Sequence, residues 1–216
     1  MSLLIFDLDG TLIDSRLDLV HATNSTRAHA GLPPISAELI YSFVGDGAPV
    51  LVRRAMGPDA SDHNVSLALA YFLEYYRHHA LDHTTLYPGV RESLERLHAA
   101  GHQLAILTNK PVRISNRILE GLGIAPLFFQ VCGGNSFEFK KPNPIGIDSL
   151  RAEANAQPAD TWMVGDSHVD IRTARNAGVK SCGVTWGFQP ETLRDCPPDL
   201  LIDRMEELAD RFAVIA

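Results

Sequence analysis

Leu3-Leu4-Ile5-Phe6-Asp7-Leu8-Asp9-Gly10-Thr11 begins with a continuous apolar run and ends in two acids, a glycine and a hydroxyl. An apolar run without polar alternation is typical of a parallel strand that is buried on both faces. Side chains two positions apart leave a strand on the same side, so Asp7 and Asp9 are expected together at its carboxyl end. Open α/β sheets bind their ligands there. An acidic pair before a glycine is also common in solvated turns, so the other strand ends must distinguish the two interpretations.

Short apolar runs recur along the chain and alternate with helical patterns. The helical patterns at 90–100, 112–122 and 171–177 each end at a glycine, the common stop signal after a last helical turn. This alternation predicts an α/β fold with a doubly wound parallel sheet. Further strands are predicted at 103–107, 131–133, 161–164 and 181–185.

One long stretch interrupts the alternation. Residues 14–83 contain helical patterns but no convincing strand, and they separate the first strand from the helix after Pro88-Gly89. We therefore predict an inserted helical cap domain over 14–83 and a Rossmann-like core formed by 1–13 and 84–216. A chain of 216 residues is long enough for a core domain plus a small insertion.

The ends of the other predicted strands also carry polar groups. Thr108-Asn109-Lys110 follows the second strand, Lys140-Lys141-Pro142-Asn143-Pro144 lies beyond the third, and Gly165-Asp166-Ser167-His168-Val169-Asp170 ends the fourth. Parallel strands end at the same edge of a sheet, so two acid pairs, a hydroxyl and a lysine are expected to meet there. This convergence favours a functional site over a solvated turn.

These motifs resemble, in type and in order, those of the haloacid dehalogenase superfamily and, within it, the bacterial phosphoglycolate phosphatase group. A match in several parts along the whole chain is more specific than any part alone. Asp7-Leu8-Asp9-Gly10-Thr11-Leu12 matches the family's DxDGT, Thr108 its second-motif hydroxyl, Lys141 its lysine, and Gly165-Asp166 with Asp170 its GDxxxD. Thr108-Asn109-Lys110-Pro111, Lys141-Pro142-Asn143-Pro144 and Val44-Gly45-Asp46-Gly47 are closer to the group.

The resemblance implies a phosphatase that passes through an aspartyl-phosphate. Asp7 would attack the phosphorus of a phosphate monoester, which a carboxylate can approach only where cations offset the repulsion. Asp9 would protonate the departing alkoxide, and it must therefore start protonated. Thr108 and the backbone of Asn109 would donate to phosphoryl oxygens, while Lys141 supplies a fixed positive charge.

The resemblance also implies Mg²⁺ as the cofactor and a small phosphorylated metabolite, first of all 2-phosphoglycolate, as the substrate. Asp7, Asp166 and the backbone carbonyl of Asp9 would hold the ion, and Asp170 would orient its ligand shell.

Two features of the predicted cap are candidates for substrate binding. Gly45 lies in the short loop Gly45-Asp46-Gly47, which by resemblance faces the substrate. Arg54 shares a helix face with Val50 and Leu51, which predicts an inward-facing guanidinium that needs an anion. That anion is either a substrate carboxylate or an acid of the cap, and both remain open.

Composition limits the partners. A net charge of −7 disfavours nonspecific binding of nucleic acid. No apolar run approaches the ~18 residues of a membrane span, and the N-terminal run lacks the features of a signal peptide. We expect a cytoplasmic protein, as a monomer or a homodimer.

The cysteines and clustered histidines have simple interpretations. Cys132, Cys182 and Cys196 lack CxxC spacing, which favours reduced packing residues. His78, His79 and His83 have no Cys or Glu at matching spacing, which favours exposed histidines at a helix end over a metal site.

Alternative functions remain at this point. Another phosphoryl-transfer enzyme of the same fold, such as a sugar-phosphate phosphatase, a pyrophosphatase or a phosphomutase, fits the motifs because the cap selects the leaving group. A dehalogenase is disfavoured, since Asp9 would have no alkoxide to protonate. The alternatives from another class are a signalling receiver domain and a Mg²⁺ or phosphate sensor without turnover. A receiver would not account for the long helical insertion or for Asp9.

Overall fold

Residues 1–212 are described by a computed structural model. The chain divides into two units, one formed by residues 1–14 and 86–216 and the other by residues 15–85. The first unit contains the main sheet, and the second is helical.

The main sheet has six parallel strands in the order β5-β4-β1-β6-β7-β8. β1 is central, and its residue Ile5 lies beside Ala105 on one neighbour and Met163 on the other. The predicted α/β class with a parallel sheet is therefore confirmed. The strands are β1 (Leu3–Phe6), β4 (Gln103–Leu107), β5 (Gln130–Cys132), β6 (Thr161–Gly165), β7 (Lys180–Val184) and β8 (Leu200–Ile202).

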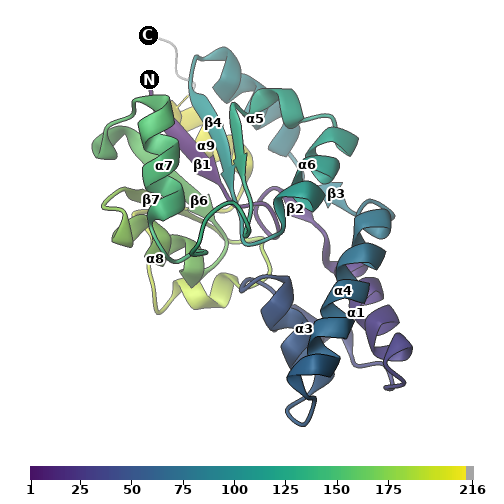
Figure 1. Ribbon diagram of the computed structural model, residues 1–216. Coiled ribbons are helices and arrows are strands. Elements are labelled where there is room, and N and C mark those ends of the chain that lie inside the picture. The colour runs from purple at the N-terminus through teal and green to yellow at the C-terminus, as the bar shows by residue number, and fades with distance from the viewer. Residues whose placement is uncertain (213–216) are drawn as a thin grey trace. The chain divides into compact units, whose positions relative to one another are not determined.

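Helices cover both faces of this sheet (Figure 1). Leu3 and Ile5 of β1 pack with Ile147 of α7 and Ala174 of α8, so these two helices share one face. On the other face α5 packs against α9, and Trp162 of β6 contacts the ring of Phe212. The helices are α5 (Val90–Ala99), α6 (Val112–Gly121), α7 (Ile145–Ala154), α8 (His168–Asn176) and α9 (Met205–Phe212), with short 3-10 turns at Ala125–Leu127, Pro158–Asp160 and Pro190–Leu193.

Some elements have no counterpart in the prediction. These are α7, β8, α9 and a two-stranded sheet formed by β2 (Ile13–Asp14) and β3 (Thr85–Leu86). β2, β3 and β8 are only two or three residues long. Apolar runs of this length carry no periodicity, so their pairing depends on neighbours that are distant in sequence.

The helical unit contains α1 (Arg16–His29), α2 (Ala37–Tyr41), α3 (Ala48–Met56) and α4 (Asp62–His79). α1 and α3 both pack against α4. Its core includes Leu19, Leu51, Phe72 and Tyr76, which are all buried. The hydroxyls of Ser36 and Ser61 accept hydrogen bonds from the backbone of the first turns of α2 and α4, as N-caps do.

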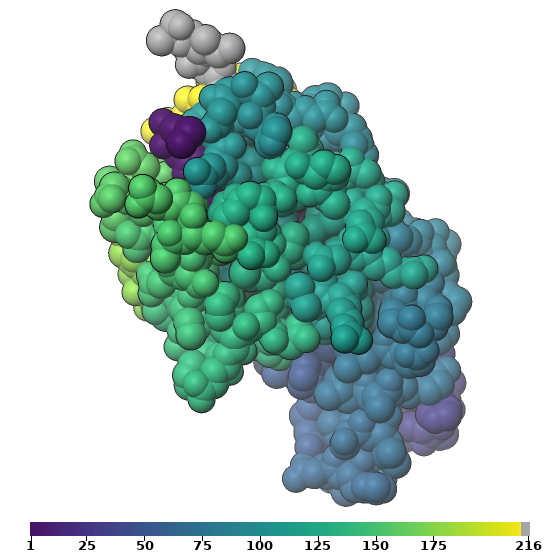
Figure 2. Space-filling model, turned by 45° about the horizontal axis from the view of Figure 1, so that its top comes forward, coloured from purple at the N-terminus to yellow at the C-terminus, as the bar shows by residue number. Residues whose placement is uncertain are grey.

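The start of the chain lies at the surface of the first unit (Figure 2). Met1 is exposed, whereas the backbone nitrogen of Ser2 donates a hydrogen bond to Nδ1 of His102. The thiols of Cys132, Cys182 and Cys196 are free and buried, which confirms their packing role. Within residues 1–212, none of the helices combines the length and apolarity needed to cross a membrane.

Candidate active site

Asp7 follows β1 directly at the carboxyl edge of the sheet. Its backbone nitrogen donates to the carbonyl of Val164 on β6, which extends the pairing of these strands by one step. Its carboxylate is buried beside the ammonium group of Lys141, with Nζ 2.9 Å from Oδ1. This contact lies off the direction of a hydrogen bond, so Asp7 Oδ1 accepts none from any residue of 1–212.

Lys141 joins Asp7 to Asp170. Its Nζ donates to Oδ1 of Asp170 at 2.6 Å, while the backbone nitrogen and the hydroxyl of Ser167 both donate to Oδ2 of Asp170. Both oxygens of Asp170 are thus engaged, and the side chain is fully buried. Asp170 orients Lys141 and the start of α8.

Asp166 follows β6 and lies in a tight backbone cradle. Its Oδ2 accepts hydrogen bonds from the backbone nitrogens of Phe188 at 2.6 Å and Gln189 at 3.3 Å. A Cβ at Gly187 would lie 2.1 Å from Cβ of Asp166, and one at Gly10, where φ is +79°, would lie 2.4 Å from Oδ2. Both positions therefore need glycine to admit this carboxylate.

Negative charge exceeds positive charge at this edge. Burial, reinforced by Asp170 and opposed by Lys141, raises the pKa of Asp7 from 3.8 to about 6. Burial, together with the charges of Asp170 and Asp7, raises the pKa of Asp166 from 3.8 to about 8. Burial lowers the pKa of Lys141, but Asp170 and Asp7 outweigh it and the net shift is upward. Such crowding of buried carboxylates is what a bound cation relieves.

Thr108 and Asn109 follow β4 and are both buried. The backbone nitrogen of Thr108 donates to the carbonyl of Cys132 at the end of β5. Because Thr108 directly follows β4, its side chain lies at the carboxyl edge of the sheet. The side chain of Asn109 brackets the backbone of Lys141, accepting from its nitrogen at 3.0 Å and donating to its carbonyl at 3.2 Å. Asn109 therefore fixes the position of Lys141, a role that the sequence did not indicate.

Lys110 is a functional candidate that sequence reasoning missed. Its Nζ donates to both oxygens of Asp9, at 2.7 and 2.9 Å, and its side chain is almost completely buried. Asp9 is therefore ion-paired with a lysine in this structure, a contact that the sequence analysis did not predict. The available signal was the place of Lys110 directly after Thr108-Asn109.

Comparison with known proteins identifies the family of the chain. The family model for haloacid dehalogenase-like hydrolases matches residues 4–184. The chain belongs to this family. A phosphoglycolate phosphatase of Vibrio vulnificus is 40% identical, with 100% of this chain and 98% of the relative covered. One of Chromobacterium violaceum is 38% identical, with 95% and 93% covered.

A solved structure is also similar over almost the whole chain. A crystal structure from Haemophilus somnus, described as a predicted phosphoglycolate phosphatase, has a TM-score of 0.92 and 33% identity, with 98% of this chain and 97% of that chain covered. The present chain is thus a haloacid dehalogenase-like hydrolase, which sets aside the receiver-domain and sensor alternatives.

The acids of this hydrolase fit a magnesium ion. Oxygens of Asp7, Asp166 and Asp170 lie within 4.8 Å of one another, and carboxylate oxygens are the protein ligands that Mg²⁺ prefers. Asp7 Oδ1 accepts no hydrogen bond from residues 1–212, although Nζ of Lys141 lies 2.9 Å from it, and Asp166 uses only Oδ2 in its cradle. Asp7 and Asp166 therefore have ligand atoms to offer, whereas Asp170 fits an orienting role.

The candidate residues of the helical unit are placed differently from the prediction. Arg54 on α3 is exposed rather than inward-facing, with 42% of its side chain accessible. Its Nη2 lies 2.8 Å from Oδ2 of Asp46, so an acid of the same unit meets the guanidinium. Its neighbour Val50 is half-buried. Sharing a helix face with Val50 therefore did not place Arg54 in the core. Gly45 is exposed with φ of +114°.

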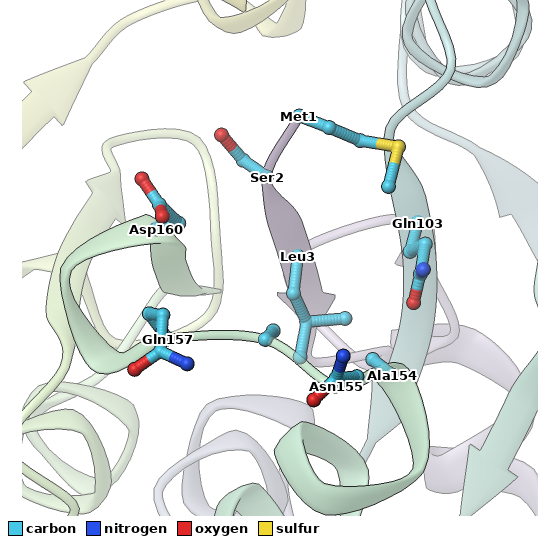
Figure 3. A pocket seen from close by; sticks show the side chains of 9 residues that line it. Met1, Ser2, Leu3, Gln103, Ala154, Asn155, Gln157 and Asp160 are labelled. Atoms are coloured by element: carbon cyan, nitrogen blue, oxygen red, sulfur yellow. The ribbon is translucent and has the colours of Figure 1, made fainter.

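A cavity of about 100 Å³ lies at the opposite edge of the sheet, around the start of β1. Figure 3 shows Ser2 and Leu3 on one side of it and Gln157 and Asp160 on the other. Its lining contains a single acid and no basic side chain. This cavity therefore lacks the groups that phosphate chemistry requires.

Proposed function

We propose that this hydrolase is a Mg²⁺-dependent phosphatase that forms an aspartyl-phosphate on Asp7 and acts on 2-phosphoglycolate. The observation that carries the proposal is the carboxylate of Asp7, held against Lys141 at the end of β1 with an oxygen that accepts no hydrogen bond within the described chain. A nucleophile needs such an available lone pair, fixed in position beside positive charge.

In the first step an oxygen of Asp7 forms a bond to phosphorus as the bond to the ester oxygen breaks. Asp9 gives its proton to the departing alkoxide. Because Asp9 is ion-paired with Lys110, this pair must open and Asp9 must gain a proton before the step. Thr108 and Lys141 donate to phosphoryl oxygens and offset their charge.

In the second step water attacks the phosphorus of the aspartyl-phosphate. Asp9, now a carboxylate, accepts a proton from this water, and the bond between phosphorus and Asp7 breaks. Orthophosphate leaves, and Asp7 is regenerated. Asp7, Asp166 and the backbone carbonyl of Asp9 would hold Mg²⁺, with Asp170 orienting the ligands, and the bound ion would neutralise phosphoryl charge.

The assignment of 2-phosphoglycolate is supported by the names of the full-length relatives. This substrate carries a carboxylate close to its phosphate, so a selective enzyme needs a further positive group. We propose Arg54 for this role, with the substrate carboxylate replacing Asp46 as its partner. We also propose that the backbone at Gly45, in the loop that contains Asp46, approaches the substrate closely. We likewise propose residues 14–83 as the cap that selects the substrate.

The test is a panel of phosphate monoesters with Mg²⁺ that contains 2-phosphoglycolate, sugar phosphates, pyrophosphate and p-nitrophenyl phosphate. We expect the highest kcat/KM for 2-phosphoglycolate. Asp7→Asn should lower turnover of every substrate by at least about a thousandfold, as loss of a nucleophile does. The control Asp160→Asn, at the opposite edge of the sheet, should retain activity.

Two outcomes would contradict different parts of the proposal. Substantial turnover by Asp7→Asn would remove the aspartyl-phosphate mechanism. Equal kcat/KM for phosphates with and without a carboxylate would leave the mechanism and indicate a broad-range phosphatase.

A further inference from the structure

A second group of potential metal ligands lies within the helical unit. Asp18 and His21 are one turn apart on α1, and His83 lies where the chain returns toward β3. One carboxylate oxygen of Asp18 and one ring nitrogen of each histidine lie within 4.8 Å of one another. The group therefore joins residues from the first and the last segments of the unit.

Asp18 is 1% exposed, and its two oxygens differ in their surroundings. Oδ2 accepts three hydrogen bonds, from the backbone nitrogens of His83 and Thr84 and from the hydroxyl of Thr84. Oδ1 is buried and accepts none from residues 1–212. A buried carboxylate oxygen without a partner is unfavourable, and a cation would satisfy it.

The two imidazoles have the arrangement that a shared ion requires. Their ring centroids lie 5.2 Å apart with planes at 77°. Two imidazoles on one tetrahedral zinc, at Zn–N distances of about 2.0–2.1 Å, have centroids about 5 Å apart. Both histidines are exposed, and within residues 1–212 neither ring makes a hydrogen bond or an ion pair. Their nitrogens are therefore available to an ion from solvent.

We propose that Asp18, His21 and His83 form a binding site for a divalent first-row transition ion of the Zn²⁺ class. Two imidazoles and a carboxylate suit Zn²⁺, Co²⁺ or Ni²⁺, with water in the remaining position, and they do not suit Mg²⁺, which prefers oxygen ligands. This site is separate from the acids at the edge of the main sheet. The bound ion ties the first turns of α1 to the segment before β3 and stabilises the helical unit.

The experiment is a titration of the full chain with Co²⁺ in excess Mg²⁺, so that Mg²⁺ occupies the acidic site of the core. Binding is followed by the visible absorption of coordinated Co²⁺, and the thermal midpoint is measured with and without Zn²⁺. His21→Ala and His83→Ala are compared with wild type, because both positions are exposed and these variants should fold. His63→Ala, an exposed histidine of the same unit, is the matched control.

We expect one Co²⁺ per chain in wild type and in His63→Ala. Each of the other variants should bind at least about 10-fold more weakly, since even loss of an outer partner costs about 10- to 100-fold. Zn²⁺ should raise the thermal midpoint of wild type and His63→Ala only. Failure of wild type to bind Co²⁺, or equal affinity in wild type and either ligand variant, overturns the proposal.

Discussion

At the scale of single residues, Lys110 changes the interpretation of Asp9. Nζ of Lys110 donates to both oxygens of Asp9, so the carboxylate has a fixed position. In the proposed mechanism, this ion pair must open before Asp9 can serve as the acid.

We expect Lys110→Met to lower kcat by roughly 10- to 100-fold, up to the lower end of the about 10²–10⁴-fold that a positioned general acid contributes, because Asp9 itself remains. The deficit should be larger for an alkyl phosphate than for p-nitrophenyl phosphate, whose leaving group needs no proton. Steady-state kinetics on both substrates check this, and Lys110→Arg should recover part of the loss because it keeps the charge.

Lys180→Met is the control for this change, because Lys180 is an exposed lysine on β7. It should leave both rates unchanged. Equal deficits of Lys110→Met on the two substrates would mean that Lys110 does not act through Asp9.

Arg54 provides the residue-scale test of substrate choice. Arg54→Ala should weaken kcat/KM for 2-phosphoglycolate by about 1.5–3 kcal/mol, the value of a hydrogen bond to a charged group. Turnover of p-nitrophenyl phosphate, which has no carboxylate, should change little. The matched control is Arg53→Ala, since Arg53 is the adjacent arginine and pairs with Asp62. Equal losses of Arg54→Ala on both substrates would make Arg54 a structural partner of Asp46.

Most residues that the sequence singled out meet at one edge of the sheet, because each follows a parallel strand. Strand ends are visible in a sequence, so Asp7, Asp166 and Lys141 could be predicted to converge. Partners that depend on the path of loops could not be predicted. The cradle of Phe188 and Gln189 around Asp166 and the approach of His83 to Asp18 both join distant segments. Asp18 was not recognisable as a neighbour of His83, because 65 positions of the chain separate them.

At the scale of elements, the segment after β7 determines how Asp166 is held. Gly187 lies against Asp166 so closely that any side chain must displace one of them. Gly187→Ala should therefore move the nitrogens of Phe188 and Gln189 away from Asp166 and weaken Mg²⁺ binding by roughly 10- to 100-fold, as loss of outer-shell partners does. The Mg²⁺ dependence of kcat/KM measures this.

Gly178→Ala is the matched control. Gly178 has φ of +65°, but a Cβ at this position would meet nothing within 4 Å, so alanine there strains the backbone without touching the site. It should lower the thermal midpoint and leave the Mg²⁺ dependence unchanged. A similar Mg²⁺ dependence in both variants would show that the segment after β7 does not support the ion.

The elements that could be predicted are those with a recognisable pattern over several consecutive residues. β1, β4 and β6 are continuous apolar runs because both of their faces are buried, and Gly101 and Gly123 follow α5 and α6. β8 was not predicted because a three-residue strand is recognisable only by its pairing with β7. The position of Arg54 on the same helix face as Val50 wrongly predicted an inward-facing side chain, because α3 is short and only part of its circumference is buried.

At the scale of the whole molecule, the buried carboxyl groups of Asp7 and Asp166 link stability to pH and to Mg²⁺. The pKa of Asp7 rises from 3.8 to about 6 and that of Asp166 from 3.8 to about 8 on folding. Above pH 4 the folded state therefore holds protons that the unfolded chain has released. The free energy of unfolding falls with pH wherever the folded state binds more protons. This contribution to stability is complete below about pH 4 and is lost as the pH rises through about 6 and then about 8.

We therefore expect the thermal midpoint of the metal-free protein, measured in EDTA, to fall as the pH rises from about 5 to about 9. Mg²⁺ competes with protons for the same oxygens, so the increase that it gives should be small at pH 5 and larger at pH 9. Asp166→Asn removes the group with the largest shift and should flatten both trends. A metal-free midpoint that rises steadily over this range would contradict the burial of uncompensated charge at the carboxyl edge, because only carboxylates stabilised by folding would make the protein more stable as they ionise.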